Sequence, residues 1–293
     1  MRKNKLFLKI LITLVFSFLI FNSSFAVELP SINKSKIRLS IASGEAKYGE
    51  IIIENTSSET RSMRVYLSDW YYLPAANGTK EFVSAGSTSL SCAPWISFSP
   101  AEFTLEPFAQ QKINYTVKVP EGASGGYYAA MFFESVFGKL ESQQKEFKAG
   151  MNIVIRVATL FYIEPAGSIK RSALIDNLSF GKDKSDSPTI GLDFKNTGNV
   201  DITCGGTFNI MDEEGMVYAR GEFNDVYTFA ASSAKLSAIC KDPPKKGKYD
   251  LILTFDLGKA LEEDNFGRGP VITKEVKIEI GDNGQFTALG ELN

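Results

Sequence analysis

Hydrophobic and polar residues alternate strictly in the middle of the chain, between residues 112 and 119. A period of two places one set of side chains on a core and the other in water, so this run predicts a half-buried antiparallel strand. Similar runs at 103–105 and 127–135 flank it, and turns that contain proline separate the three. The apolar positions of the middle strand are Ile113, Tyr115, Val117 and Val119.

A weak internal repeat divides the rest of the pattern into two halves. Each half has a strand, an Asn-Thr turn at 55–56 or 196–197, and a second strand. Later, Tyr127 or Tyr128 in one half and Tyr249 in the other precede an apolar strand, the place where immunoglobulin-like sandwiches often carry a tyrosine. We therefore predict an all-β fold of two tandem immunoglobulin-like β-sandwiches after a cleaved signal peptide. The predicted divisions are 1–26 for the signal peptide, 27–166 for the N-terminal sandwich, 167–281 for the C-terminal sandwich and 282–293 for a polar tail.

The first 26 residues carry the features of an export signal. A basic start leads into an apolar run at 10–21 and then into small residues at 24–26. The run is shorter than the roughly 20 residues needed to cross a bilayer. No later run is long and apolar enough to span, so we expect a periplasmic or extracellular protein without a membrane span in the mature chain.

Composition removes several classes of function. The chain has no histidine, which excludes the usual catalytic triads and zinc sites built from His and Cys. Three Ser-x-x-Lys pairs occur without the companion motifs of penicillin-recognising enzymes, and the net charge of -2 makes nucleic acid an unexpected partner. We predict no enzyme activity, no cofactor and no metal, and we interpret the acidic stretches 212–214 and 262–264 as solvated turns.

The three cysteines suggest one disulfide bond. Cys204 and Cys240 lie in the same half of the chain, each at the end of a strand-like run, and an oxidising compartment would allow them to pair. Cys92 remains over. We expect it to be a small buried residue, with a link between two chains as the alternative.

Several local strings resemble one family of binding proteins. Residues 51–55 look like a second strand that closes on an asparagine, 103–113 look like a turn into a strand, and 160–165 (LFYIEP) are similar to an L-F-Y-R-P strand ending. Together they resemble the N-terminal domain of the periplasmic pilus-assembly chaperones, the PapD-like family. The resemblance covers residues 35–166, and the second half matches only as a second sandwich.

This resemblance implies a partner and a site. The family binds unfinished pilin sandwiches by supplying a strand, so the expected partner is another exported protein, a pilin-like subunit or a surface protein. The implied anchor for the partner's terminal carboxylate is Arg38 with Arg156, because a pair of cations forms charge-assisted hydrogen bonds with a carboxylate. The residues implied for the partner-binding edge strand are Asn152, Val154, Arg156, Ala158 and Leu160.

Two other interpretations stay open. The run 117–127 is similar to a segment of the WxL-interacting proteins, which are two-sandwich proteins of the cell surface. A structural or adhesion protein of the surface, self-associating through sandwich edges, would also fit the pattern. These hypotheses therefore differ in the partner that they predict, which is an exported subunit, a surface component or a second copy of the chain.

Overall fold

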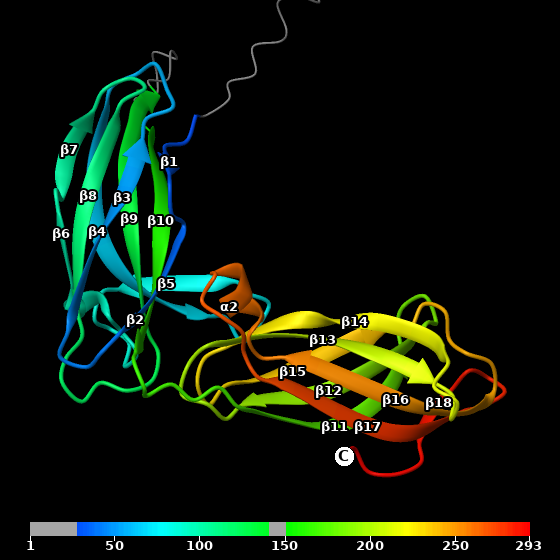
Figure 1. Cartoon of the computed structure of the whole chain (residues 1–293). Coiled ribbons are helices and arrows are strands. Elements are labelled where there is room, and N and C mark those ends of the chain that lie inside the picture. The colour runs from blue at the N-terminus through cyan, green and yellow to red at the C-terminus, as the bar shows by residue number, and fades with distance from the viewer. Residues whose placement is uncertain (1–27, 141–150) are drawn as a thin grey trace, which may run out of the picture.

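The structure is a computed structural model that describes residues 28–140 and 151–293, so the predicted signal peptide lies outside the described residues. Two domains built from β-strands meet at an elbow and give the chain an L shape (Figure 1). The predicted all-β fold is confirmed. None of the helices in the described part of the chain is long and apolar enough to cross a bilayer.

The N-terminal domain is a sandwich of two sheets. Sheet I has the strand order β1-β3-β8-β6, and sheet II has the order β2-β10-β9-β4-β5 with β7 also paired to β4. The strands are β1 Ser31–Ile32, β2 Lys36–Ile41, β3 Ala46–Glu54, β4 Arg61–Tyr72, β5 Lys80–Ser84, β6 Ile96–Ser99, β7 Glu102–Leu105, β8 Gln110–Lys118, β9 Tyr127–Leu140 and β10 Met151–Pro165, and a 3-10 turn η1 spans Ala93–Trp95.

The C-terminal domain is one ladder of eight strands, in the order β11-β12-β15-β14-β13-β16-β17-β18. All eight strands contribute to a single buried core, so the ladder wraps around that core. The elements are β11 Ala173–Lys182, β12 Pro188–Asn196, β13 Ile202–Met211, β14 Val217–Thr228, β15 Ser233–Ile239, β16 Gly247–Asp256, the short helix α2 Lys259–Glu263, β17 Val271–Ile280 and β18 Phe286–Ala288.

The alternating run that opened the sequence analysis forms β8. Its apolar positions are buried between sheets I and II, together with side chains of β3, β4, β9 and β10. The flanking runs form β7 and β9, as predicted. The period of two thus identified both the strands and their core face.

The internal repeat has a physical counterpart in two buried asparagines. The Asn55 side chain accepts a hydrogen bond from the backbone N–H of Ser57 and donates one to the carbonyl of Glu59. Asn196 does the same with Gly198 and Val200, two and four residues further on. Each side chain closes the turn that follows its strand, because an asparagine can satisfy the backbone groups that the turn leaves unpaired.

The tyrosine expected near the start of the sixth strand of the second domain also forms a hydrogen bond from its hydroxyl to the backbone. Tyr249 lies near the start of β16 and donates its hydroxyl to the carbonyl of Lys245 at 3.0 Å. The corresponding tyrosine of the first half, Tyr128, has a different role, which is described with the domain junction below.

The predicted disulfide between Cys204 and Cys240 is wrong, because all three cysteines are free and buried. Strand β14 lies between β13, which carries Cys204, and β15, which Cys240 follows. Two strand spacings amount to about 10 Å, whereas the Cα atoms of a disulfide lie about 4.4–6.8 Å apart. The ladder also offsets the two along β14, since Cys204 lies opposite Val226 and Ala238 lies opposite Phe223.

We therefore expect a thiol assay in denaturant without reductant to titrate three thiols per chain. In the folded protein the same reagent should react slowly, because burial raises the pKa of Cys240 to about 11 and the pKa of Cys204 to about 12. Reductant should leave the melting temperature unchanged. A loss of two thiols in the denatured, oxidised sample would contradict the free pair.

Candidate protein-binding edge and interdomain cleft

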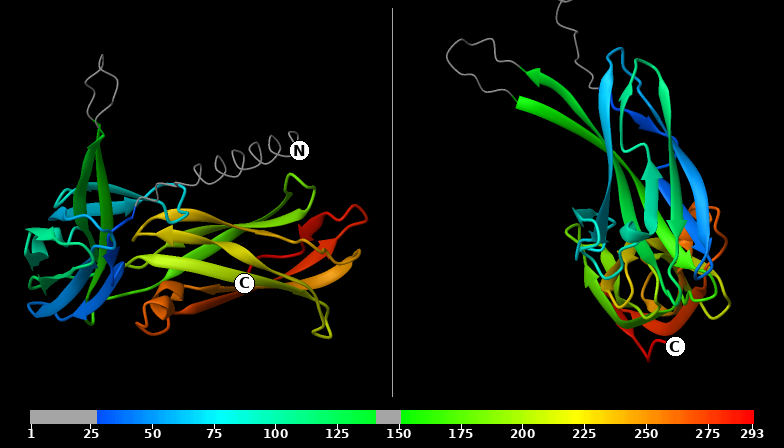
Figure 2. Two further views of the ribbon diagram at one scale, coloured as in Figure 1. Left: turned by 90° about the horizontal axis from the view of Figure 1, so that it is seen from above. Right: turned by 90° about the vertical axis from the view of Figure 1, so that its left-hand side faces the viewer.

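Strand β10 has a free edge over its first half. It pairs with β9 along almost its whole length, but on its other side the described residues pair with it only from Leu160 to Pro165, where β2 runs parallel to it. The backbone N–H of Leu160 donates to Ser35 on that side. Because N–H groups alternate in direction along a strand, those of residues 154, 156 and 158 point to the same, uncovered side. Figure 2 shows β9 and β10 projecting together from the N-terminal domain.

The side chains of β10 that the structure describes lie on two faces, one toward the core and one on the outside of sheet II. Ile155, Phe161 and Ile163 are buried, and Phe161 and Ile163 belong to the core between the sheets. Val154 is 48% exposed on the opposite, outer face of sheet II. The side chain of Asn152, the first of the predicted site residues, lies outside the described residues.

The outer face of sheet II changes from charged to apolar toward the elbow. Its side chains lie in cross-strand rows contributed by β4, β9 and β10. The rows are Arg64, Glu134 and Arg156 at the distal end, then Tyr66, Phe132 and Ala158, and then Ser68, Ala130 and Leu160. Phe82 of β5 extends the apolar part, with its ring 4.9 Å from that of Phe132.

At the elbow an aromatic cluster joins the two domains. Trp70 is 1% exposed, and its ring contacts Tyr128 and Tyr162 of the same sheet. Phe229 of the C-terminal domain stacks on Tyr128 with 4.3 Å between ring centroids and lies 5.2 Å from Trp70. This cluster buries the end of the outer face that lies against the C-terminal domain.

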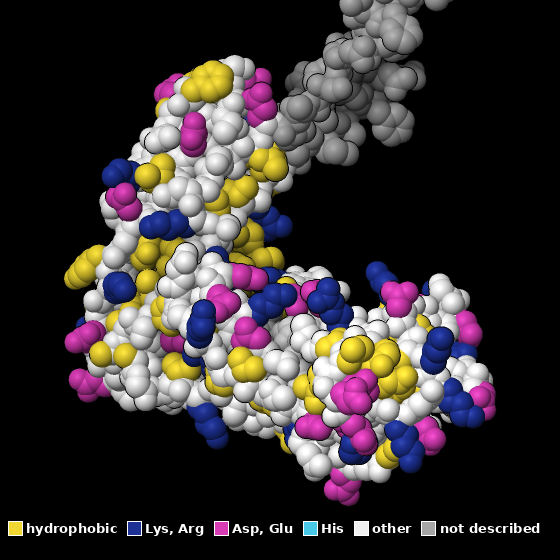
Figure 3. All heavy atoms as spheres, turned by 45° about the vertical axis from the view of Figure 1, so that its right-hand side comes forward, with side chains coloured by type: hydrophobic (Ala, Val, Ile, Leu, Met, Phe, Trp, Pro, Cys, Tyr) yellow, Lys and Arg dark blue, Asp and Glu magenta, His cyan; other side chains and the backbone are white. Residues whose placement is uncertain are grey.

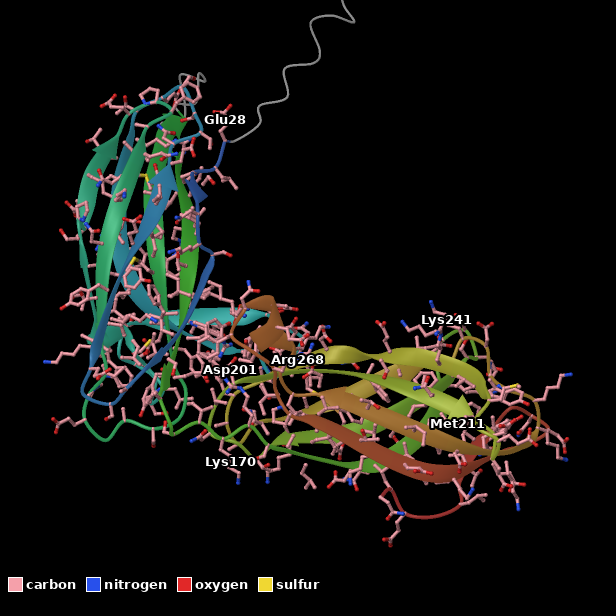
Figure 4. The ribbon with its side chains drawn as sticks, viewed as in Figure 1. Glu28, Lys170, Asp201, Met211, Lys241 and Arg268 are labelled. Carbon is pink, nitrogen blue, oxygen red and sulfur yellow. The ribbon has the colours of Figure 1, made fainter. Side chains whose placement is uncertain are left out.

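A buried charge cluster lies beside the aromatic rings and centres on Arg38, whose side chain is 1% exposed. Arg38 donates to both carboxylate oxygens of Asp201, at 2.9 and 3.1 Å, and to Asp264 at 2.8 Å. It also donates to Glu164, which Arg171 binds as well. Figure 4 places Asp201 where the two domains meet. The guanidinium therefore connects β2 and β10 of one domain to two separate segments of the other.

The partners of Arg38 compensate for its burial. Burial by itself lowers the pKa of a guanidinium, but the charge and hydrogen bonds of Asp201, with the charge of Glu164 and the hydrogen bond of Asp264, raise the pKa of Arg38 above its ordinary value. Tyr128 completes the cluster, because its hydroxyl accepts from the backbone N–H of Asp201 at 2.6 Å and donates to the Asp201 carboxylate at 3.3 Å. Tyr128 therefore links the two domains.

Asp264 corrects the interpretation of 262–264 as a solvated turn. Its side chain is only 10% exposed and binds Lys36 at 2.8 Å as well as Arg38. The acidic stretch ends the short helix α2, and the fold places that helix at the elbow (Figure 1). A separation of 226 residues between Arg38 and Asp264 leaves no signal in a single sequence.

A hollow of about 380 Å³ opens at the elbow beside this cluster. Lys36 of β2 and Lys80 of β5 line it, with Leu160, Ala158 and Phe82 on the apolar side. The Lys80 ammonium lies over the rings of Trp70 and Tyr72, at 5.5 and 5.3 Å from their centroids. Figure 3 shows hydrophobic and basic side chains next to one another on the N-terminal domain near the elbow.

The lining of this hollow has charges of both signs, because Asp201 and Glu263 line it together with the two lysines. Burial, and after it the charge of Lys36, lowers the pKa of Lys80. A carboxylate beside Lys80 would offset both effects, because an opposite charge favours the protonated ammonium. Sequence reasoning missed Lys80, which lies in a Ser/Gly/Ala-rich stretch with no resemblance to guide it.

The structure does not bring Arg38 and Arg156 together. Arg38 lies opposite Tyr162 in the parallel pairing of β2 with β10. Arg156 lies six residues earlier on β10, about 20 Å away at the usual rise of a strand. It is exposed on the outer face and donates to the hydroxyl of Tyr66 at 3.3 Å. Arg38 is bound by carboxylates at the domain junction, whereas Arg156 faces solvent.

A larger hollow of about 800 Å³ lies in the C-terminal domain, between β14 and β15. Only Phe223 and Ala238 pair these strands. Its charged lining has both signs, with Arg220 and Lys241 beside Glu222 and Asp242. It lies away from the free edge of β10, and its charges select no class of ligand.

No family model matches the chain, and no curated protein matches it. Solved structures of fimbrial chaperones are similar to it in fold. The class 5 fimbriae chaperone CfaA has 13% identity and a TM-score of 0.46, with 83% of this chain and 98% of that chain covered. The Pseudomonas aeruginosa CupB2 chaperone has 9% identity and a TM-score of 0.36 over 84% and 98% of the two chains.

A structure of the Salmonella enterica SafA pilin in complex with the SafB chaperone gives 10% identity and a TM-score of 0.42 over 85% of this chain and 97% of that chain. At these identities the likeness is one of fold alone. Each of the three structures contains a protein named as a chaperone.

Proposed function

We propose that this protein is an exported, non-enzymatic chaperone that holds another polypeptide by β-strand addition along β10. The observation that carries the proposal is the uncovered edge of β10 beside an outer face that is apolar near the elbow. A strand with free N–H and C=O groups is a template for another strand, and neighbouring apolar side chains add specificity. The added strand would continue the sheet where β2 stops covering β10.

The hollow at the elbow supports an end point for that strand. A segment that runs parallel to β10, from its distal end toward the elbow, would bring its terminal carboxylate to Lys36 and Lys80. Arg38 then has a supporting role, since it binds the same carboxylate group, Asp264, that holds Lys36. We therefore place the carboxylate anchor at Lys36 and Lys80 and assign Arg38 to the junction between domains.

The partner in this proposal is another exported polypeptide with an unfinished sandwich, such as a pilin-like subunit or a surface protein. The division between the two sandwiches is proposed to lie between residues 166 and 167. Function is proposed to take place in the periplasm or outside the cell, to which the signal at 1–26 would direct the chain.

A photo-crosslinking amino acid at Val154 tests the proposal in cells that export the full chain. Val154 is 48% exposed beside the free edge of β10, and Tyr48 of β3 on sheet I, 78% exposed, provides the matched control position. We expect position 154 to crosslink to a different exported polypeptide, identified by mass spectrometry of the linked peptide, and position 48 not to do so. Equal crosslinking from both positions would contradict the proposal, and crosslinks only to a second copy would favour self-association through sandwich edges.

A further inference from the structure

The distal row of the outer face carries two cations that form no ion pair with any side chain that the structure describes. Arg64, Glu134 and Arg156 lie side by side on β4, β9 and β10. Glu134 accepts a hydrogen bond from Tyr66 at 3.1 Å. Arg156 donates to the Tyr66 hydroxyl and lies 5.5 Å from the centroid of the Phe132 ring, and Arg64 lies 5.6 Å from that of Tyr66. In the described part of the chain these two guanidinium groups contact rings and a hydroxyl, so the row has a net positive charge.

This row adjoins the free edge of β10, so a strand added there would place side chains next to it. In neighbouring strands, side chains at paired positions lie on the same face of the sheet. The residue of the partner beside Arg156 would therefore project over the outer face, toward the positive row. The residue beside Ala158 would contact the apolar row with Phe132.

We infer that this edge selects segments with an acidic side chain beside Arg156, about two residues before the carboxyl-terminal residue. The inference rests on the proposed function. The spacing follows from the register, because Lys36 occupies the position opposite Leu160, so the added strand ends near Ala158, two residues after Arg156. The preferred segment thus reads acidic, any, apolar carboxyl-terminal residue, with its terminal carboxylate next to Lys36.

Charge complementarity favours this partner over an entirely apolar one. A wholly apolar segment would cover Arg156 without replacing its water, and an uncompensated cation is costly to desolvate. A carboxylate would supply a charge-assisted hydrogen bond to the guanidinium in its place. The distal row therefore fixes the register of the added strand, which a repetitive apolar segment could otherwise shift by two residues.

Synthetic peptides test the inference with the mature chain in solution. The probes are nine-residue peptides of alternating Thr and Val with a labelled N-terminus and a free carboxyl terminus. The third residue from the end, two before the terminal one, is Glu, Gln or Lys. Binding is measured by fluorescence anisotropy. We expect the Glu peptide to bind roughly twofold to fivefold more tightly than the Gln peptide, as for a partly exposed ion pair, and the Lys peptide to bind least.

Variants of the protein then test whether Arg156 causes the preference for the Glu peptide. Arg156→Gln should abolish the difference between the Glu and Gln peptides, and Arg156→Glu should favour the Lys peptide. Lys112→Gln, which changes an exposed lysine of sheet I, should leave the preference intact. Equal affinity for all three peptides, or a preference that survives Arg156→Gln, would overturn this inference and leave strand addition standing. Absence of binding by every peptide would contradict the proposed function as well.

Discussion

Replacing Arg38 by methionine is expected to lower the free energy of unfolding by about 3–5 kcal/mol, the usual cost of leaving buried charges without their partner. The guanidinium is the shared partner of Asp201, Glu164 and Asp264, whose side chains are 2%, 3% and 10% exposed. Urea denaturation followed by circular dichroism measures the loss. Because two domains are present, the transition should be fitted by domain if it separates into two steps.

Two further variants distinguish this effect from a general loss of packing. Adding Asp201→Asn to Arg38→Met should recover part of the stability, because it removes one of the carboxylates left unpaired. Lys112→Met removes an ion pair with Glu50 whose side chains are 62% and 45% exposed, and it should cost at most about 1 kcal/mol. A loss below 1 kcal/mol for Arg38→Met would show that the carboxylates find water or other partners.

The Ala158→Pro variant is expected to lose partner binding by at least about a hundredfold while remaining folded, because proline removes a donor and is tolerated at a strand edge. The N–H of Ala158 points to the free side of β10, as judged from the bond that Leu160 makes to Ser35 two residues later. The same crosslinking and peptide assays measure the loss. The melting temperature should change little.

The neighbouring position provides the control. The N–H of Val157 points to β9, because successive N–H groups alternate in direction along a strand. Val157→Pro should therefore lower the melting temperature clearly, since proline there removes a ladder bond inside the sheet. Unchanged partner binding by a folded Ala158→Pro variant would exclude strand addition at this edge.

Local patterns predicted the local parts of this fold. The alternation at 112–119 is a property of the strand itself, and the structure confirms both the strand β8 and its buried face. The Asn-Thr turns were visible as a repeat because each asparagine bonds to residues two and four positions away. Such short-range chemistry leaves a signature in a single sequence.

The candidate site depends on contacts that leave no such signature. The register of the C-terminal ladder separates Cys204 from Cys240, and that register follows from packing across strands. Asp264 comes to Arg38 through the placement of α2 at the elbow. Lys80 reaches the hollow because β5 pairs with β4, within a stretch whose composition suggests only an insertion.

For the same reason, the family resemblance located strand β10 but did not indicate which cations are available to bind a carboxylate. Residues 160–165 sit on β10 where the resemblance places them, and the faces of the strand follow from it. Which cations are available for a ligand depends on how many carboxylates already surround them. Arg38 has three such neighbours from distant parts of the chain.

The shared guanidinium also limits how this protein can be divided or recombined. An isolated first sandwich would retain Arg38 and Glu164 but lose Asp201 and Asp264, and it would expose the rings of Trp70 and Tyr128 that Phe229 covers. A hybrid that joins this sandwich to a foreign second half would need acids at both of those places and an aromatic side chain over the rings. The two domains therefore depend on each other for their stability. Truncation would yield a fragment with an exposed hydrophobic patch that promotes aggregation.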